Sequence, residues 1–253
     1  MTKLIEDILW LSQELETLRP ELKIISISAK ASDSFFINSA DSNTRLIAKQ
    51  DIGEYRLEPM LQIAQSEYIT KPQIFEIITN AQISKTEQKI SSEFLIHAIG
   101  LVFAEANYLL HSHSTKVNKV LASKLGAKAF RGHVFEESVI ICGKNPASIK
   151  FAESGYQLAT AIYRELSSFQ KIYFHLPKIL LLENHGVVIL AKNPKELITI
   201  TKTLELWAEL IYAAYQLGGP NYLSLDNVMN IETENRSTQN QEKTTIDKNL
   251  SEK

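Results

Sequence analysis

Three of the six histidines of this 253-residue chain lie in two short polar segments, each of which follows an apolar run. The first segment is His111-Ser112-His113, and the second is Glu183-Asn184-His185-Gly186. Side chains alternate between the two faces of an extended strand, so His111 and His113 are expected to project from the same face. Neutral imidazoles at strand ends are typical ligands of a catalytic zinc site that keeps one coordination position open. These histidines therefore predict a metal site.

Both segments also allow a simpler interpretation. His111 and His113 would then be surface residues leading into a helix, and Asn184-His185-Gly186 would be a turn in which Gly186 supplies a positive φ angle. However, a polar break between two apolar runs costs free energy unless its groups find partners. A metal ion would be such a partner.

Ser91-Ser92-Glu93 opens a predicted helix that ends just before the first histidine pair, which makes Glu93 a further candidate for the site. An acidic residue is also favoured in the first turn of any helix by the helix dipole. Ser91 and Ser92 would either cap the helix or hold an anion. The remaining histidines, interpreted as structural or loop residues, are His97, His133 and His175.

The composition favours one large domain with a real core, since 44% of the residues are hydrophobic. A net charge of −2 gives no reason to expect nucleic acid or an anionic membrane as a partner. The single cysteine, Cys142, excludes an internal disulfide and is expected to be a small buried hydrophobe. No apolar run is long enough to cross a membrane, and residues 2–18 predict an acidic amphipathic helix rather than a signal peptide. A cytoplasmic location is therefore expected.

Apolar spacing and turn residues predict alternating helices and strands. The Asn-Pro pairs at 145–146 and 193–194 are expected to begin two long helices, and Gly218-Gly219 to end the second. The helices are expected over residues 2–18, 57–66, 92–105, 114–124, 145–169 and 193–217. The strands are expected over residues 23–27, 35–37, 45–48, 107–111, 134–142, 179–182 and 187–190. The irregular alternation favours a layered α/β fold with a largely antiparallel sheet.

Two features of the C-terminal part suggest domain limits and contacts. Residues 232–253 are polar and predict a disordered tail after a domain that spans residues 1–231. The last long helix carries an apolar face that would serve either an oligomer interface or packing on the chain's own sheet. That face consists of Leu204, Trp207, Ile211 and Tyr215.

The order of Ser91-Ser92-Glu93, His111-Ser112-His113 and Asn184-His185-Gly186 resembles the class II aldolase/adducin family, over roughly residues 5–232. The resemblance implies a three-layer α-β-α sandwich around a mainly antiparallel sheet. It implies a divalent metal, usually Zn²⁺, on His111, His113 and His185, and Glu93 as the catalytic acid or base. It also implies that Ser91 and Ser92 bind substrate phosphate, and that the chain forms a homotetramer with its sites at subunit interfaces.

The phosphate-binding part departs from the family pattern. That pattern has Gly-Asn, a strand residue and Ser, where this chain has Ile25-Ser26-Ile27-Ser28. A later Ser-Gly of the family is replaced by Ser39-Ala40. Ser28 and Ser39 thus remain as candidate substrate-binding residues, while the added side chains are expected to crowd a phosphate.

The resemblance implies a metal-dependent aldehyde-lyase of the aldolase type in carbohydrate metabolism. It would act on a sugar-like or hydroxy-carbonyl substrate through a metal-stabilised enediolate. One alternative is a sugar-phosphate epimerase or dehydratase on the same scaffold. The other is a catalytically silent, adducin-like interaction domain, although adducin-type members generally lack the metal histidines.

Overall fold

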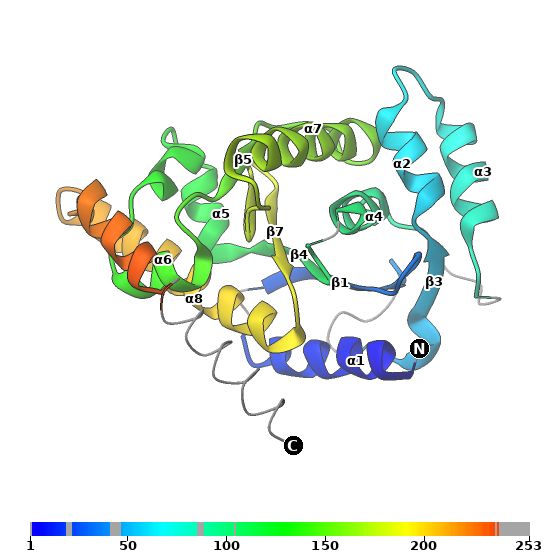
Figure 1. Cartoon of the computed structure of the whole chain (residues 1–253), viewed down its shortest axis with the longest axis horizontal. Helices are drawn as coiled ribbons and strands as arrows, with labels where there is room; N and C mark the ends of the chain where they lie inside the picture. Colours follow the sequence, from blue (N-terminus) through cyan, green and yellow to red (C-terminus); the bar gives the residue numbers. More distant parts are fainter. Residues whose placement is uncertain are drawn as a thin grey trace.

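The computed structural model describes residues 2–18, 22–40, 47–84, 89–103, 105–235 and 237, with the side chains of residue 2 and residues 22–25 excepted. These residues form a central sheet with helices on both faces (Figure 1). The helices are α1 Thr2–Glu16, α2 Glu58–Gln65, α3 Lys71–Ala81, α4 Phe94–Val102, α5 Thr115–Leu121, α6 Glu136–Cys142, α7 Tyr156–Tyr173 and α8 Pro194–Gln216. The strands are β1 Leu22–Lys30, β2 Ser34–Asn38, β3 Ile52–Arg56, β4 Tyr108–Ser114, β5 Ala147–Ile149, β6 Ile179–Leu182 and β7 Gly186–Ala191. Two short 3₁₀ helices are Lys49–Asp51 and Gly126–Arg131.

The described strands form one sheet in the order β3-β2-β1-β4-β7-β6-β5. The pairing is antiparallel throughout except between β5 and β6, which are parallel. The expectation of a three-layer α/β fold with a mainly antiparallel sheet is therefore confirmed. The central strand, β4, carries the first histidine pair, and its neighbour β1 carries Ser26 and Ser28.

Each face of the sheet buries its own apolar core. Helices α1, α5, α6 and α8 cover one face, and α2, α4 and α7 cover the other. Along β4, Leu110 packs into the first core and Leu109 into the second. Because strand side chains alternate, His111 and His113 share the face of Leu109 and point to the side of α4.

The strand expected over residues 134–142 is wrong, because these residues form α6 from Glu136 to Cys142. Two acidic residues stand in its first turn, where the helix dipole favours them. Val139 and Cys142, three residues apart, are both buried, and α6 packs against α8. A short apolar run does not distinguish helix from strand, and tertiary packing decided this one. The expectation that Cys142 is a buried hydrophobe is confirmed.

The two Asn-Pro pairs have different outcomes. Asn193 caps α8 as expected, since its side chain accepts a hydrogen bond from the Glu196 backbone N–H at 3.0 Å. Asn145-Pro146 instead leads into the edge strand β5, and the helix expected from residue 145 begins only at Tyr156. A proline is tolerated at the start of an edge strand, where no ladder hydrogen bond is lost.

Some elements in the first third of the chain were not expected. Strand β3 and helix α3 had no counterpart in the sequence prediction. The strand expected over residues 45–48 falls partly outside the described residues, and 47–48 precede a 3₁₀ helix rather than forming a strand. β3 has only five residues and a glycine at its second position, so its alternation is weak.

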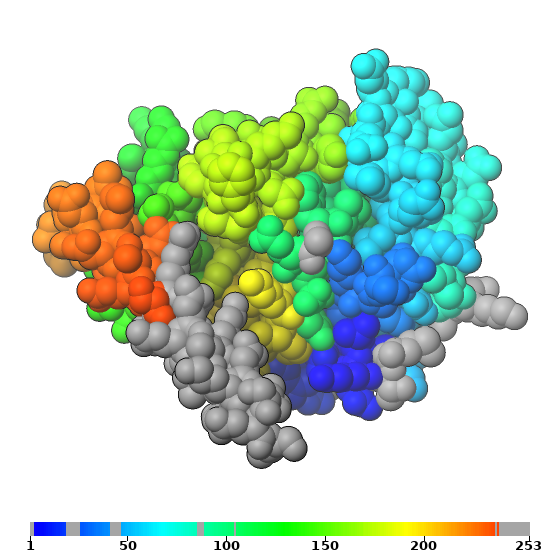
Figure 2. Space-filling view, viewed as in Figure 1, coloured from blue at the N-terminus to red at the C-terminus, as the bar shows by residue number. Residues whose placement is uncertain are grey.

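The C-terminal segment continues the fold beyond α8. Residues 225–235 are helical, and Glu232 forms an ion pair with Lys144 at 2.8 Å. In Figure 2 this segment, in orange, lies at one edge of the molecule beside the green segments. The first four residues of the expected tail thus have a defined conformation, while residues 238–253 lie outside the described part, where disorder stays a prediction.

Within the described residues, none of the helices combines the length and the apolar character that crossing a membrane would require.

Candidate metal centre

The first two histidines come from the end of the central strand β4. His111 is completely buried, and its Nδ1 lies 3.2 Å from the backbone oxygen of Val187 on β7. A carbonyl oxygen only accepts hydrogen bonds, so Nδ1 of His111 carries a proton, and Nε2 is the ring nitrogen left for the site. The side chain of His113 is 25% exposed, on the same face as His111 and nearer the strand end. The alternation of a strand therefore aims both rings at one point.

The third histidine is placed by a tight turn between β6 and β7. Asn184 adopts a left-handed conformation with φ 57°, and the His185 backbone N–H donates to the Leu182 oxygen at 3.1 Å. The side-chain amide of Asn118, on α5, donates to the backbone oxygen of His185 at 3.1 Å. Both contacts hold the His185 ring near the other two histidines. Its ring centroid lies 5.2 Å from that of His111 and 4.8 Å from that of His113.

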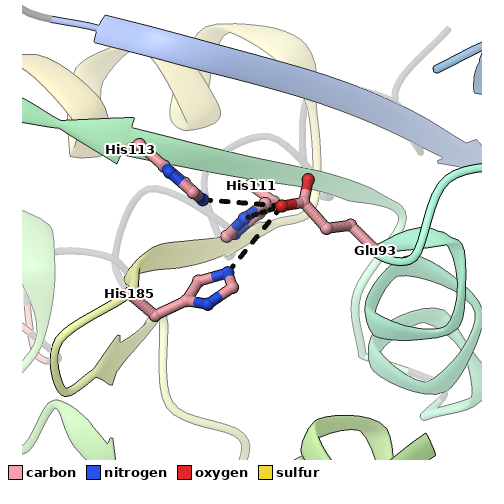
Figure 3. A group of neighbouring side chains, drawn as sticks. All are labelled: Glu93, His111, His113 and His185. Carbon is pink, nitrogen blue, oxygen red and sulfur yellow. Dashed lines mark ion pairs between the residues drawn. The ribbon is translucent and has the colours of Figure 1, made fainter. Parts of the chain in front are cut away.

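Glu93 reaches the histidines from the opposite side of the site, at the start of α4 (Figure 3). Its Oε1 lies 3.4 Å from Nε2 of His111, 3.5 Å from Nε2 of His113 and 3.8 Å from Nε2 of His185. The backbone N–H of Glu93 donates to the Ser91 hydroxyl at 3.2 Å. Ser91 therefore shapes the turn that presents the carboxylate.

The charges of the site are arranged around an ionised carboxylate. Burial acts to raise the pKa of Glu93, but contacts and charge interactions with His111 and His113 outweigh it and hold this pKa far below the ordinary value. Burial, followed by the influence of His111 and His113, lowers the pKa of His185 to about 4. His185 is therefore neutral near pH 7 and presents a lone pair.

Three imidazole nitrogens and a carboxylate that face one another form a site for a cation. Nε2 of His111, His113 and His185 is buried in each case and has no hydrogen-bond partner. The four candidate ligand atoms lie within 4.8 Å of one another, so one ion could contact all of them. Buried polar atoms without partners are costly, and a bound metal would remove that cost. The residues present thus fit a divalent metal.

Comparison with known proteins identifies the family. The model of the class II aldolase and adducin N-terminal domain matches residues 25–212. The chain belongs to the class II aldolase and adducin family. A 5-deoxy-D-ribulose 1-phosphate aldolase from Bacillus thuringiensis serovar kurstaki is 27% identical over 169 residues, which cover 65% of this chain and 72% of that relative.

Solved structures show the same fold. The structure of an L-fuculose 1-phosphate aldolase matches with a TM-score of 0.69 at 14% identity, covering 92% of this chain and 96% of that one. A sugar-phosphate aldolase from Thermotoga maritima matches with a TM-score of 0.63 at 16% identity, covering 87% and 98%. At these identities the likeness concerns the fold of a class II aldolase alone.

The serines expected to bind substrate lie in different surroundings. Ser39 is half-buried, and its hydroxyl donates to the backbone oxygen of Lys89 at 3.3 Å, two residues before Ser91. Ser92 is exposed beside the same loop. The structure thus places Ser39 against Lys89, in the segment that leads to Ser91, Ser92 and Glu93. Ser28 differs, because it is completely buried and its hydroxyl lies 2.7 Å from Nδ1 of His97.

Of two residues that support the candidate metal site, Asn118 was not singled out from the sequence and Gly186 was assigned a different role. Asn118 follows the histidine strand by one helical turn, but a single polar residue in a helix is a weak signal. Gly186 was expected only to supply a positive φ angle, and it does not adopt one. Its role is close approach, since a Cβ there would lie 2.6 Å from the backbone oxygen of Ser112.

Replacing Gly186 with alanine is therefore expected to lower the free energy of unfolding by about 1–3 kcal/mol, as overpacking of a buried site does. The added Cβ would also lie 3.0 Å from the His113 ring and 3.3 Å from the His111 ring, so metal uptake should fall as well. Urea unfolding and metal analysis measure the two effects. Gly143→Ala is the control, because an added Cβ there meets nothing within 4 Å while the positive φ angle still strains an alanine. Its free energy of unfolding should fall, but its metal uptake should stay unchanged. Normal stability of Gly186→Ala would contradict the argument.

Proposed function

We propose that this chain is a metal-dependent class II aldolase that cleaves a carbon–carbon bond in a sugar-like or hydroxy-carbonyl substrate. The observation that carries the proposal is the convergence of three buried imidazole nitrogens, none of them hydrogen-bonded, on one ionised carboxylate. Buried polar atoms without hydrogen bonds cost free energy in an apolar layer, and a bound metal would remove that cost. The aldolase activity named for the Bacillus relative supports the reaction type.

In this proposal His111, His113 and His185 hold the metal. Imidazole nitrogens suit zinc among the abundant divalent metals, and three protein ligands leave a position for substrate. A divalent ion held there supplies a Lewis acid that stabilises the negative charge developing next to the substrate carbonyl. The hydrogen bond from Nδ1 of His111 to the Val187 oxygen fixes the orientation of that ring.

Glu93 is proposed to move the proton that bond cleavage requires. Its carboxylate is ionised, largely screened from solvent and presented by a helix start, so it is held in place before substrate arrives. Ser91 keeps that helix start in shape through the Glu93 backbone N–H. Ser39, Ser91 and Ser92, grouped at the loop, are proposed to contact substrate, whereas Ser28 is enclosed and would act only from behind the site.

The test is a cleavage assay with purified, zinc-loaded protein and a panel of sugar-like compounds. Aldehyde and ketone products are identified by mass spectrometry, which separates cleavage from its rivals on the same scaffold. An epimerase would return an isomer of unchanged mass, and a dehydratase would release water. A protein that binds metal but transforms none of the panel would favour the adducin-like alternative.

The substrate is expected to lack a phosphate group, although the names of the relatives include phosphate. Ser26 stands where the family pattern has asparagine, and its hydroxyl lies 2.7 Å from Nε2 of His97, so it is engaged inside the fold. Ala40 stands where the pattern has glycine. Turnover of matched phosphorylated and unphosphorylated compounds measures the preference, expected to be about 10-fold or more for the unphosphorylated member. A preference for phosphorylated compounds would contradict this expectation, but not the aldolase proposal.

The chain is also proposed to form a homotetramer that completes its sites at subunit interfaces. Leu204, Trp207 and Ile211 do not serve such an interface, because they are buried in the chain's own core. Other apolar side chains remain exposed on α8 and after it, including Leu206, Leu210, Leu217 and Leu225.

Two cavities in the described part of the chain have volumes of about 510 and 840 Å³. Neither is lined by Glu93 or by the three histidines of the proposed metal site. Light scattering is expected to give about four times 28.6 kDa, and a monomer would contradict a shared site.

A further inference from the structure

A second buried polar cluster, formed by Ser26, Ser28 and His97, lies directly behind the proposed metal site. The Ser26 hydroxyl lies 2.7 Å from Nε2 of His97, and the Ser28 hydroxyl lies 2.7 Å from Nδ1 of the same ring. His97 and Ser28 are completely buried, and Ser26 is 9% exposed. Both ring nitrogens are therefore used inside the protein, so His97 itself has no free nitrogen for a metal or substrate.

This cluster joins the two elements that carry the opposite halves of the site. His97 lies four residues after Glu93 and so projects from the same side of the α4 helix, one turn further on. Ser26 and Ser28 lie on β1, where Ser26 is the register partner of His111 and Ser28 that of Leu109 on β4. One imidazole therefore connects the helix that presents Glu93 to the strand next to the metal-binding histidines.

The cluster is held by directional bonds in an otherwise apolar layer. Burial lowers the pKa of His97 to about 3, so the ring is neutral and one nitrogen donates while the other accepts. The neighbours of His97 on α4, Ile96 and Ala98, are buried. Apolar packing tolerates small shifts and rotations of a helix, whereas two hydrogen bonds to fixed strand positions do not.

We propose that His97 is a positioning residue, which through Ser26 and Ser28 holds α4 so that the Glu93 carboxylate stays against His111, His113 and His185. The proposal rests on the proposed function of Glu93 as the group that moves a proton. It explains why a buried polar triad lies beside the site. Without it, Glu93 would keep its place in the chain but lose its fixed distance from the three Nε2 atoms.

The test is a cycle of four proteins, namely wild type, Glu93→Gln, His97→Gln and the double variant. Long-range ¹H–¹⁵N spectra of the metal-free proteins report the ring nitrogens of His111, His113 and His185. We expect His97→Gln to shift these signals in the direction that Glu93→Gln shifts them, and to have little further effect once Glu93 is replaced. In turnover, His97→Gln should lower kcat about 10-fold with KM within about 2-fold, and again add little in the double variant.

The matched control is His133→Gln, which removes another buried histidine whose ring nitrogens lie 2.7 Å from the Ser138 hydroxyl and 3.0 Å from the Lys144 oxygen. It should leave the ring signals of the site and kcat close to wild type. Where His97→Gln does not fold, the Ser26→Ala/Ser28→Ala variant removes the same two contacts by deleting one oxygen each. Unchanged ring signals, or equal shifts with and without Glu93, would overturn the role of His97. Absence of metal or turnover in wild type would overturn the proposed function, and the spectra of the metal-free proteins would still decide the role of His97.

Discussion

Replacing His113 with alanine is expected to remove the bound metal and to reduce activity to background. Catalytic zinc sites generally use three protein ligands, which in the proposed centre are the three imidazoles. Loss of one imidazole would leave two nitrogens and the Glu93 carboxylate around the ion. Outer contacts alone change metal affinity by roughly 10–100-fold, so loss of a direct ligand should exceed that range. Elemental analysis after dialysis is expected to give about one divalent ion per wild-type chain and little in the variant.

His113 is the most suitable of the three for this test, because its side chain is 25% exposed and its loss disturbs the core least. His111 is fully buried and bonded to β7, so its removal would also destabilise the sheet. The control is His175→Ala, since His175 lies outside the cluster and contacts the backbone oxygen of Leu176. Equal metal content in wild type and His113→Ala would refute the assignment of the ligands.

Replacing Glu93 with glutamine is expected to preserve the fold and the metal while lowering turnover by about 10²-fold or more, the usual contribution of a positioned acid or base. Glutamine has nearly the same shape but cannot take up a proton. The three histidines remain, so metal content should stay near one ion per chain. Steady-state kinetics with any compound that the cleavage assay identifies gives the ratio of kcat values.

Glu93 stands at the N-terminus of α4, where a carboxylate also stabilises a helix by a few tenths of a kcal/mol. If that were its only role, Glu93→Gln would leave turnover unchanged and lower stability slightly. Glu209→Gln is a suitable control. Glu209 is an exposed glutamate on α8, and its carboxylate pairs with the Lys116 ammonium on α5 at 2.7 Å. Turnover of Glu93→Gln within 2-fold of this control would exclude a proton-transfer role.

Local signals in the chain predicted those elements whose ends are determined by their own residues. Asn193 caps α8 with its side chain, and Pro194 fits the first helical turn, so that helix was found almost to the residue. The helix predicted to begin at the Asn-Pro pair 145–146 was wrong, because the residues that follow this pair form β5, which pairs with the neighbouring strand β6. The strand predicted over residues 134–142 was wrong for a related reason. This segment packs against α8 as a helix, and its own apolar run did not distinguish helix from strand.

The candidate site divides in the same way. The two-residue spacing of His111 and His113 places both rings on one face of any strand, and a polar break between apolar runs marks His185, so these residues could be singled out from the sequence. Glu93 could be named as a candidate, but its distance from the histidines could not be derived, because it depends on how α4 lies on the sheet. Ser28 looked like a substrate contact, yet its hydroxyl faces His97 in the interior.

By itself, the sequence determined which residues are candidates for the site, the alternation that pairs His111 with His113, and the family to which the motifs point. The tertiary structure decided the geometry, because side chains 74 residues apart, such as His111 and His185, meet only when β4 and β7 pair in one register. It also decided which polar groups face the site and which are enclosed, as Ser26 and Ser28 are by His97. The physical reason is that periodicity assigns a face to each side chain, whereas distance between faces is set by long-range packing.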